Sequence, residues 1–163
     1  MANNYGKKFE AKFKEDFKKV PGADITRLYD TTNGFKSISN VSDFVGYIFP
    51  FQYYLEAKST QGNTFSLSKL TQADKLKEKQ GIKGVNAGVV IWFIDHKKVC
   101  YVPIEEYCRL EENGYKSVNV KMIGNPDFKV YEIPGIPKRT FVDSDYTVLL
   151  DIAREKLDLL FNK

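Results

Sequence analysis

Asp43, Glu56 and Lys58 are the residues whose types and spacing could do chemistry in this sequence. Twelve residues (44–55) separate Asp43 from the run Glu56-Ala57-Lys58. Side chains two positions apart on a β-strand point to the same side, so the Glu56 carboxylate and the Lys58 ammonium would lie together. If Asp43 lies alongside, two carboxylates converge, and such hard oxygen ligands suit Mg²⁺. This arrangement can hydrolyse phosphodiesters, with Lys58 orienting the attacking water or stabilising the charge of the transition state.

An E-x-K strand can also be a solvated face that carries a charge pair, so the surrounding elements have to decide between the two explanations. The aromatic and apolar run 53–58 follows Pro50 and ends in the turn-forming residues 59–63, which predicts a strand. Leu55 and Ala57 would then face the opposite layer.

An amphipathic helix is predicted over residues 5–20, stopped by Pro21. Its apolar stripe recurs every four residues: Phe9, Phe13 and Phe17. Glu10 adjoins this stripe, so its carboxylate could reach a site beneath the helix, or it could pair with Lys14 one turn later.

The residues before the acid predict a strand around 25–29, a turn at 32–34 and a second strand leading to Asp43. Arg27 falls in the first of these strands. It could grip a phosphate through its fork of N–H donors, or it could be an exposed cross-strand residue.

After the central strand, residues 63–70 predict an extended segment, and Thr71 is expected to cap a short polar helix. Gln72 falls in the first turn of that helix and would point back toward the end of the strand. The near-continuous apolar run 85–94 predicts a strand buried on both faces, and 99–102 predicts its hairpin partner.

The last third of the chain predicts a short helix over 104–113 and short strands or loops over 115–142. A final helix is expected to begin with Asp143 or Ser144 as its cap. Its apolar face would pack on the core or on a partner subunit.

Length and composition predict one globular domain over residues 1–163, with 42% apolar residues and a net charge of +4. Positive charge concentrates in 1–20 and 58–83, which each hold six lysines and have net charges of +3 and +4. Such local charge favours a polyanionic partner, although lysines can also simply solvate two helices.

Cys100 and Cys108 have neither metal-ligand spacing nor a disulfide-rich setting, and we expect buried thiols in a reducing cytosol. The only histidine, His96, falls in a turn, which argues against a catalytic triad or a zinc site. Neither a signal peptide nor a membrane-spanning run is apparent, so we expect a soluble, cytoplasmic protein with no membrane partner.

The order of helix, acid, E-x-K strand and following helix resembles the PD-(D/E)xK nuclease superfamily. More narrowly, the chain is similar to the RecU-type Holliday junction resolvases of Gram-positive bacteria and their phages. The resemblance spans residues 5–105, and its most specific part is the run E-A-K-S-T followed by N-T-F. The segments that carry it are 6–10, 42–44, 54–60, 63–65, Gln72 and 87–94.

This resemblance implies an α/β (α+β) fold with a restriction-endonuclease-like core, in which helices flank a central mixed β-sheet. It implies a homodimeric endodeoxyribonuclease that cuts opposing strands of a four-way DNA junction symmetrically in recombination and repair. The cofactor would be Mg²⁺, for which Mn²⁺ could substitute. Asp43 and Glu56 would hold the metal, Gln72 would complete the site, Lys58 would stabilise the transition state, and Glu10 matches the first-helix acid of the superfamily.

The chain departs from the RecU-type pattern two positions before the acid, where the family has a hydroxyl residue and this chain has Val41, with Ser42 as the nearest substitute. Segment 21–42 leaves room for only a short version of the stalk that family members insert into the junction. Together with the small size, this favours a phage over a bacterial origin. The basic residues expected to contact DNA phosphates are Lys7, Lys8, Arg27, Lys69, Lys75, Lys138 and Arg139.

Two other functions stay open. The chain could be another PD-(D/E)xK endonuclease that cuts linear duplex as readily as junctions, or a non-catalytic protein that holds branched DNA. Clustered carboxylates argue against the second alternative, because a protein that only binds DNA has no need to bring like charges together.

Overall fold

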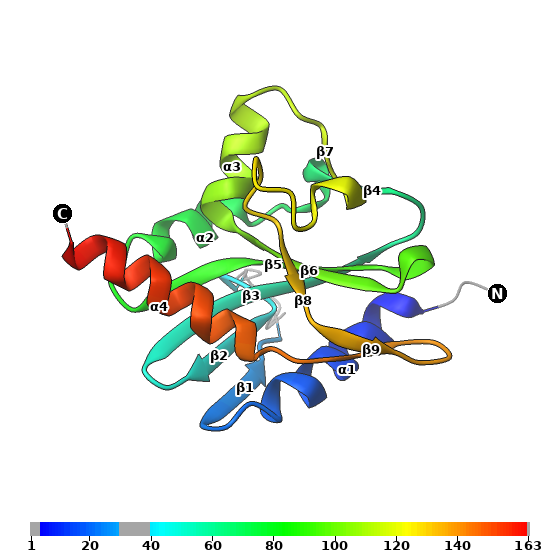
Figure 1. The fold of residues 1–163 in the computed structure, drawn as a ribbon, viewed down its shortest axis with the longest axis horizontal. Helices are drawn as coiled ribbons and strands as arrows, with labels where there is room; N and C mark the ends of the chain where they lie inside the picture. The colour runs from blue at the N-terminus through cyan, green and yellow to red at the C-terminus, as the bar shows by residue number, and fades with distance from the viewer. Residues whose placement is uncertain (1–3, 30–39, 163) are drawn as a thin grey trace, which may run out of the picture.

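A six-stranded mixed sheet organises the computed structural model, which describes residues 4–29 and 40–162 (Figure 1). In spatial order its strands are β1 (Ala23–Arg27), β2 (Phe44–Ile48), β3 (Phe51–Thr60), β5 (Val85–Phe93), β6 (Lys98–Pro103) and β8 (Tyr131–Ile133). Two small antiparallel pairs lie outside it: β4 (Thr64–Ser66) with β7 (Ser117–Asn119), and β9 (Gly135–Pro137) with β10 (Val142–Ser144).

The helices are α1 (Tyr5–Lys18), α2 (Ala73–Gln80), α3 (Ile104–Glu112) and α4 (Thr147–Phe161). Three short 3₁₀ turns complete the described elements: η1 (Leu67–Lys69), η2 (Ile94–His96) and η3 (Val120–Met122). α2 and α3 pack on one face of the sheet and α1 and α4 pack on the other, so the molecule has two separate cores (Figure 1).

The predicted central strand is confirmed as the middle of β3. β3 pairs antiparallel with β2 and parallel with β5, so it lies at the centre of the mixed sheet. A parallel pair needs a crossover connection, which β4, η1 and α2 provide here.

β5 is buried at every position, as the apolar run 85–94 predicts. Its side chains alternate between two cores on opposite faces of the sheet. Val90 and Trp92 join the core beneath α1 and α4, whereas Val89 and Ile91 join the core beneath α2 and α3. Because both of its faces are covered, this strand needs no polar positions.

The phenylalanine stripe attaches α1 to the sheet. Phe13 is fully buried, and its ring centroid lies 5.1 Å from that of Phe44 on β2 and 5.1 Å from that of Tyr146, which precedes α4. The helix ends at Lys18, slightly before the proline that was expected to stop it.

The expected strand leading into Asp43 is wrong for its described part. Residues 40–43 are not in a strand, and β2 begins after the acid, at Phe44. Burial explains this placement, because alternate residues Phe44, Gly46 and Ile48 enter the core. The predicted turn at 32–34 lies outside the described residues.

Two expected helix caps are also wrong. α2 begins at Ala73 without a side-chain cap, so Thr71 does not cap it, and 63–70 is extended only in part, since η1 follows β4. α4 begins at Thr147, while Asp143 and Ser144 belong to β10. Strand pairing and contacts with α1 hold these two residues instead.

Within the described part of the chain, no helix combines the length and apolarity needed to cross a membrane.

We predict that Gly88→Ala destabilises the protein by about 1–3 kcal/mol, because overpacking a dense core has this cost. An added Cβ on Gly88 would lie 2.6 Å from both Tyr101 Cε2 and the Val102 carbonyl oxygen. Gly6→Ala is the matched control, since nothing lies within 4 Å of its added Cβ. Urea unfolding of both variants checks this, and equal midpoints would contradict the predicted close packing of β5 against β6.

Candidate active site

The β2–β3 hairpin brings Asp43 to Glu56. Phe44 pairs with Leu55, so the next residues outward, Asp43 and Glu56, lie opposite each other where β2 begins. Lys58 follows on the same side of β3. The antiparallel register therefore explains how residues far apart in the sequence meet.

Lys58 lies between the two carboxylates. Its Nζ is 3.8 Å from Asp43 Oδ2 and 3.7 Å from Glu56 Oε2. The Glu56 side chain is only 2% exposed, whereas that of Lys58 is 33% exposed. The site thus has a buried carboxylate at its base and an ammonium that solvent or a ligand can reach.

Arg27 lies on the other side of Asp43. Its Nη1 is 3.7 Å from Asp43 Oδ1, and its Nε donates a hydrogen bond of 3.1 Å to Glu10 Oε2. Glu10 therefore turns toward the site from α1, the first of the two positions considered for it. Arg27 is not the exposed cross-strand residue that was one alternative, because carboxylates on two elements hold its guanidinium.

Sequence reasoning missed this role of Arg27 as a counter-charge. The pairing of β1 with β2 places Arg27 opposite Phe44, directly beside Asp43. The sequence predicts a strand on either side of a turn at 32–34, but it does not give the register between the two strands. A cation in a strand preceding the acid was the only available signal.

Gln72 reaches the site from the start of α2, as expected from the sequence. Acceptors surround its amide group, and with its nitrogen turned toward them it donates to the Val41 carbonyl at 3.1 Å and to Glu56 Oε1 at 2.5 Å. In this orientation Gln72 positions the Glu56 carboxyl. A role as metal ligand stays a prediction.

Ser42 does not replace the hydroxyl residue that Val41 lacks. The Ser42 side chain is buried, and its Oγ donates a 2.7 Å hydrogen bond to the Phe44 carbonyl. Val41 contributes its backbone carbonyl to Gln72 instead of a side-chain oxygen. The site therefore relies on Asp43 and Glu56.

Burial raises the pKa of Glu56 from 4.5 to about 9, and the neighbouring Asp43 carboxyl raises it further, against the opposing effect of Lys58 and Arg27. Removing a carboxylate from water disfavours its charged form, and a second carboxylate nearby adds repulsion. Without a bound cation, Glu56 is therefore protonated at neutral pH.

The donors present fit a hard divalent cation. Glu56 Oε2 is buried and accepts no hydrogen bond among the described residues, and the Asp43 carboxyl is its neighbour. Within the same residues, no group of three or more His, Cys, Asp or Glu side chains converges on one metal position. Mg²⁺ usually keeps several waters and needs only one or two protein carboxylates, so this donor set suits it.

The basic residues predicted to bind DNA fall into separate groups. Lys7 and Lys8 are exposed on the first turn of α1, and Lys69 is exposed at the end of η1. Lys75 is half-buried on α2. Lys138 and Arg139 lie in the turn between β9 and β10, beside α1 rather than beside the carboxylates.

Comparison with protein-family models and with curated proteins gives no match. Among solved structures, the chain is similar to Hjc of Archaeoglobus fulgidus, a Holliday junction resolvase from an archaeal hyperthermophile, with a TM-score of 0.54 and 17% sequence identity. The similarity covers 71% of this chain and 89% of that one. The protein therefore has the expected α/β restriction-endonuclease-like fold, with a central mixed sheet flanked by helices.

We predict that Glu56→Gln stabilises the protein increasingly as the pH rises from 5 to 8. Across this range the unfolded chain ionises Glu56, whereas the folded chain, with a pKa of about 9, keeps it protonated. Wild type therefore loses stability that the neutral glutamine retains. In EDTA, calorimetry should show the melting temperature of the variant rising by roughly 10 °C relative to wild type over this range, because the linked change in stability is about 4 kcal/mol. Glu155→Gln, an exposed substitution on α4, is the control, and a difference that shrinks with rising pH would contradict the prediction.

Proposed function

We propose that this protein is a metal-dependent endodeoxyribonuclease that resolves four-way (Holliday) DNA junctions by paired, symmetric phosphodiester hydrolysis. The observation that carries the proposal is the meeting of Asp43, Glu56 and Lys58 at one end of the β2–β3 hairpin. The fold, shared with a resolvase, supports it. The run 54–60 supports the narrower assignment to a RecU-type enzyme, and the small size and short segment before the acid support a phage origin.

The residues divide the chemical work by position. A Mg²⁺ ion held by Asp43 and Glu56 would polarise the scissile phosphate and lower the pKa of a bound water. Lys58 reaches the mouth of the site and stabilises the negative charge that builds as the water oxygen bonds to phosphorus and the P–O bond to the leaving group breaks. Gln72 and Arg27 keep the two carboxyl groups in place.

Paired cuts require two sites. The described residues contain one such group of carboxylates and lysine, so symmetric cleavage of a junction calls for two copies of the chain. A homodimer provides this, because the two-fold axis of the pair matches the near two-fold symmetry of a four-way junction.

Cleavage assays on two matched DNAs test the proposed function. We expect paired symmetric nicks in a labelled four-way junction with Mg²⁺, none with EDTA, and little cutting of a linear duplex of the same sequence. Equal cleavage of both DNAs would support a duplex endonuclease instead. Binding of the junction without any cutting would support a non-catalytic branched-DNA-binding protein.

Asp43→Ala and Glu56→Ala should each lower the rate of junction cleavage by at least about 10²–10³-fold, because each removes charge aimed at the reacting phosphate. Junction binding should persist, since the basic surface remains intact. Glu155→Ala, which removes a carboxylate far along α4, is the control for a general change in charge. Cleavage retained in either site variant would exclude these carboxylates from catalysis.

Metal binding has a readout independent of activity. Mg²⁺ at 100 times its Kd should stabilise the wild type by about 2.7 kcal/mol, as for any ligand that binds only the folded state. Asp43→Asn should abolish this thermal shift, whereas Glu155→Gln should keep it. An equal shift in all three proteins would place the metal elsewhere.

A further inference from the structure

A group of basic side chains lies between α1 and the β9–β10 hairpin, apart from the carboxylate site. The turn of the β9–β10 hairpin faces the helix across a groove of about 540 Å³. One wall carries Lys8 and Lys12 from α1, and the other carries Lys138 and Arg139 from the turn. The groove thus brings together cations that lie about 130 residues apart in the sequence.

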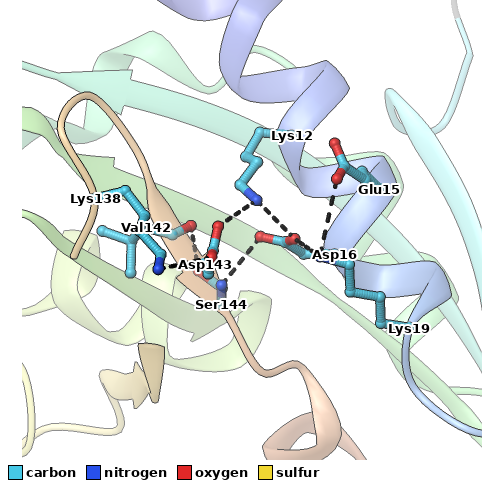
Figure 2. Close-up of polar contacts among 8 residues, drawn as sticks. All are labelled: Lys12, Glu15, Asp16, Lys19, Lys138, Val142, Asp143 and Ser144. Atoms are coloured by element: carbon cyan, nitrogen blue, oxygen red, sulfur yellow. Dashed lines mark hydrogen bonds and ion pairs between the residues drawn. The ribbon is translucent and has the colours of Figure 1, made fainter. Parts of the chain in front are cut away.

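Buried Asp16 fixes the position of this groove (Figure 2). Its side chain is 2% exposed and accepts hydrogen bonds from Lys12 Nζ at 3.0 Å, Lys19 Nζ at 3.2 Å and the Ser144 backbone N–H at 3.0 Å. Lys12 also donates to Asp143 Oδ1 at 2.7 Å, across 131 residues of sequence. These bonds join β10 to α1, so the hairpin is held against the helix.

The cations of the groove differ in how far they are already neutralised. Lys12 pairs with two carboxylates, those of Asp16 and Asp143, and so helps to hold the hairpin against α1. Lys138 is 55% exposed and shares Asp143 at a longer 3.7 Å. Lys8 and Arg139 are exposed and have no ion-pair partner among the described residues. Three side chains are therefore available to a ligand.

The groove and Glu10 lie on opposite flanks of α1, and Glu10 is linked through Arg27 to Asp43. Residues advance by about 100° each along a helix, so Glu10 and Lys12 point about 200° apart. Accordingly, Glu10 contacts Arg27 of β1, whereas Lys12 contacts Asp143 of β10. The flanks are separated by roughly one helix diameter, 10–12 Å, and Arg27 lies between Glu10 and Asp43. The groove is therefore at least about three base-pair steps of 3.4 Å, measured along a duplex axis, from the carboxylates.

We infer that this groove is a second DNA-contact surface, in which Lys8, Lys138 and Arg139 bind backbone phosphates at least about three base pairs from the scissile one. The inference rests on the proposed function, because DNA is the polyanion that the carboxylate site would cleave. Arg139 suits phosphate, since the fork of donors of an arginine binds two oxygens at once. The contacts carry no base information and set the position of the DNA on the enzyme.

Equilibrium binding of a labelled four-way junction tests the groove, in a Glu56→Gln background so that the DNA is not cut. Lys138→Ala/Arg139→Ala should raise Kd about tenfold near 100 mM salt and reduce the slope of log affinity against log salt by about two, one per lost phosphate contact. Adding Lys8→Ala should weaken binding further. With Glu56 intact, cleavage at saturating protein should fall much less than affinity.

Lys116→Ala/Lys121→Ala is the charge-matched control, because both lysines are exposed and lie near β7 and η3, away from α1 (Figure 1). It should change neither Kd nor the salt slope by a comparable amount. An equal loss in the control, or no loss in the groove variant, would overturn the inference while leaving the nuclease proposal intact. Failure of the Glu56→Gln parent to bind the junction would overturn both.

Discussion

The repulsion between two carboxylates is the constraint on which the rest of the site depends. Glu56 is buried away from water beside Asp43, and both its burial and the Asp43 carboxyl raise the cost of ionising Glu56. Two cations reduce this repulsion. Lys58 lies within 4 Å of both carboxyl groups, and Arg27 contacts Asp43. The raised pKa of Glu56 favours a proton on its carboxyl, and in the proposed function a divalent cation would take the place of that proton.

The register of β2 against β3 brings the two carboxyl groups together. A slip of one residue between β2 and β3 would turn Glu56 into the core beneath α1 and place Leu55 at the site. The slip is prevented because alternate β3 side chains, including Tyr53 and Leu55, are packed in that core, and because β5 pairs with β3 along nearly its whole length. The apolar interior therefore controls the spacing of the charges.

Much of this could be predicted from local patterns. The Phe stripe of α1, the run 85–94 and the alternation along β3 are strong signals. In each case the spacing of the apolar residues matches the face or faces that the element buries. The prediction that Asp143 or Ser144 caps the last helix was wrong. Both residues have side chains typical of caps, but they belong to β10 and are bonded to α1. The Arg27 contact and the basic groove depend on distant segments meeting, which periodicity does not encode.

The bonds of Asp16 have a consequence for how the chain can be divided. The part that resembles a nuclease ends near residue 105, yet Asp16 and the ring of Phe13 are covered by Ser144 and Tyr146. A shortened chain lacking the last third would leave a carboxylate without its backbone donor and expose the face of α1 that seats the helix bearing Glu10. The segment with the weakest sequence signals is thus needed to complete the fold around the segment with the strongest ones.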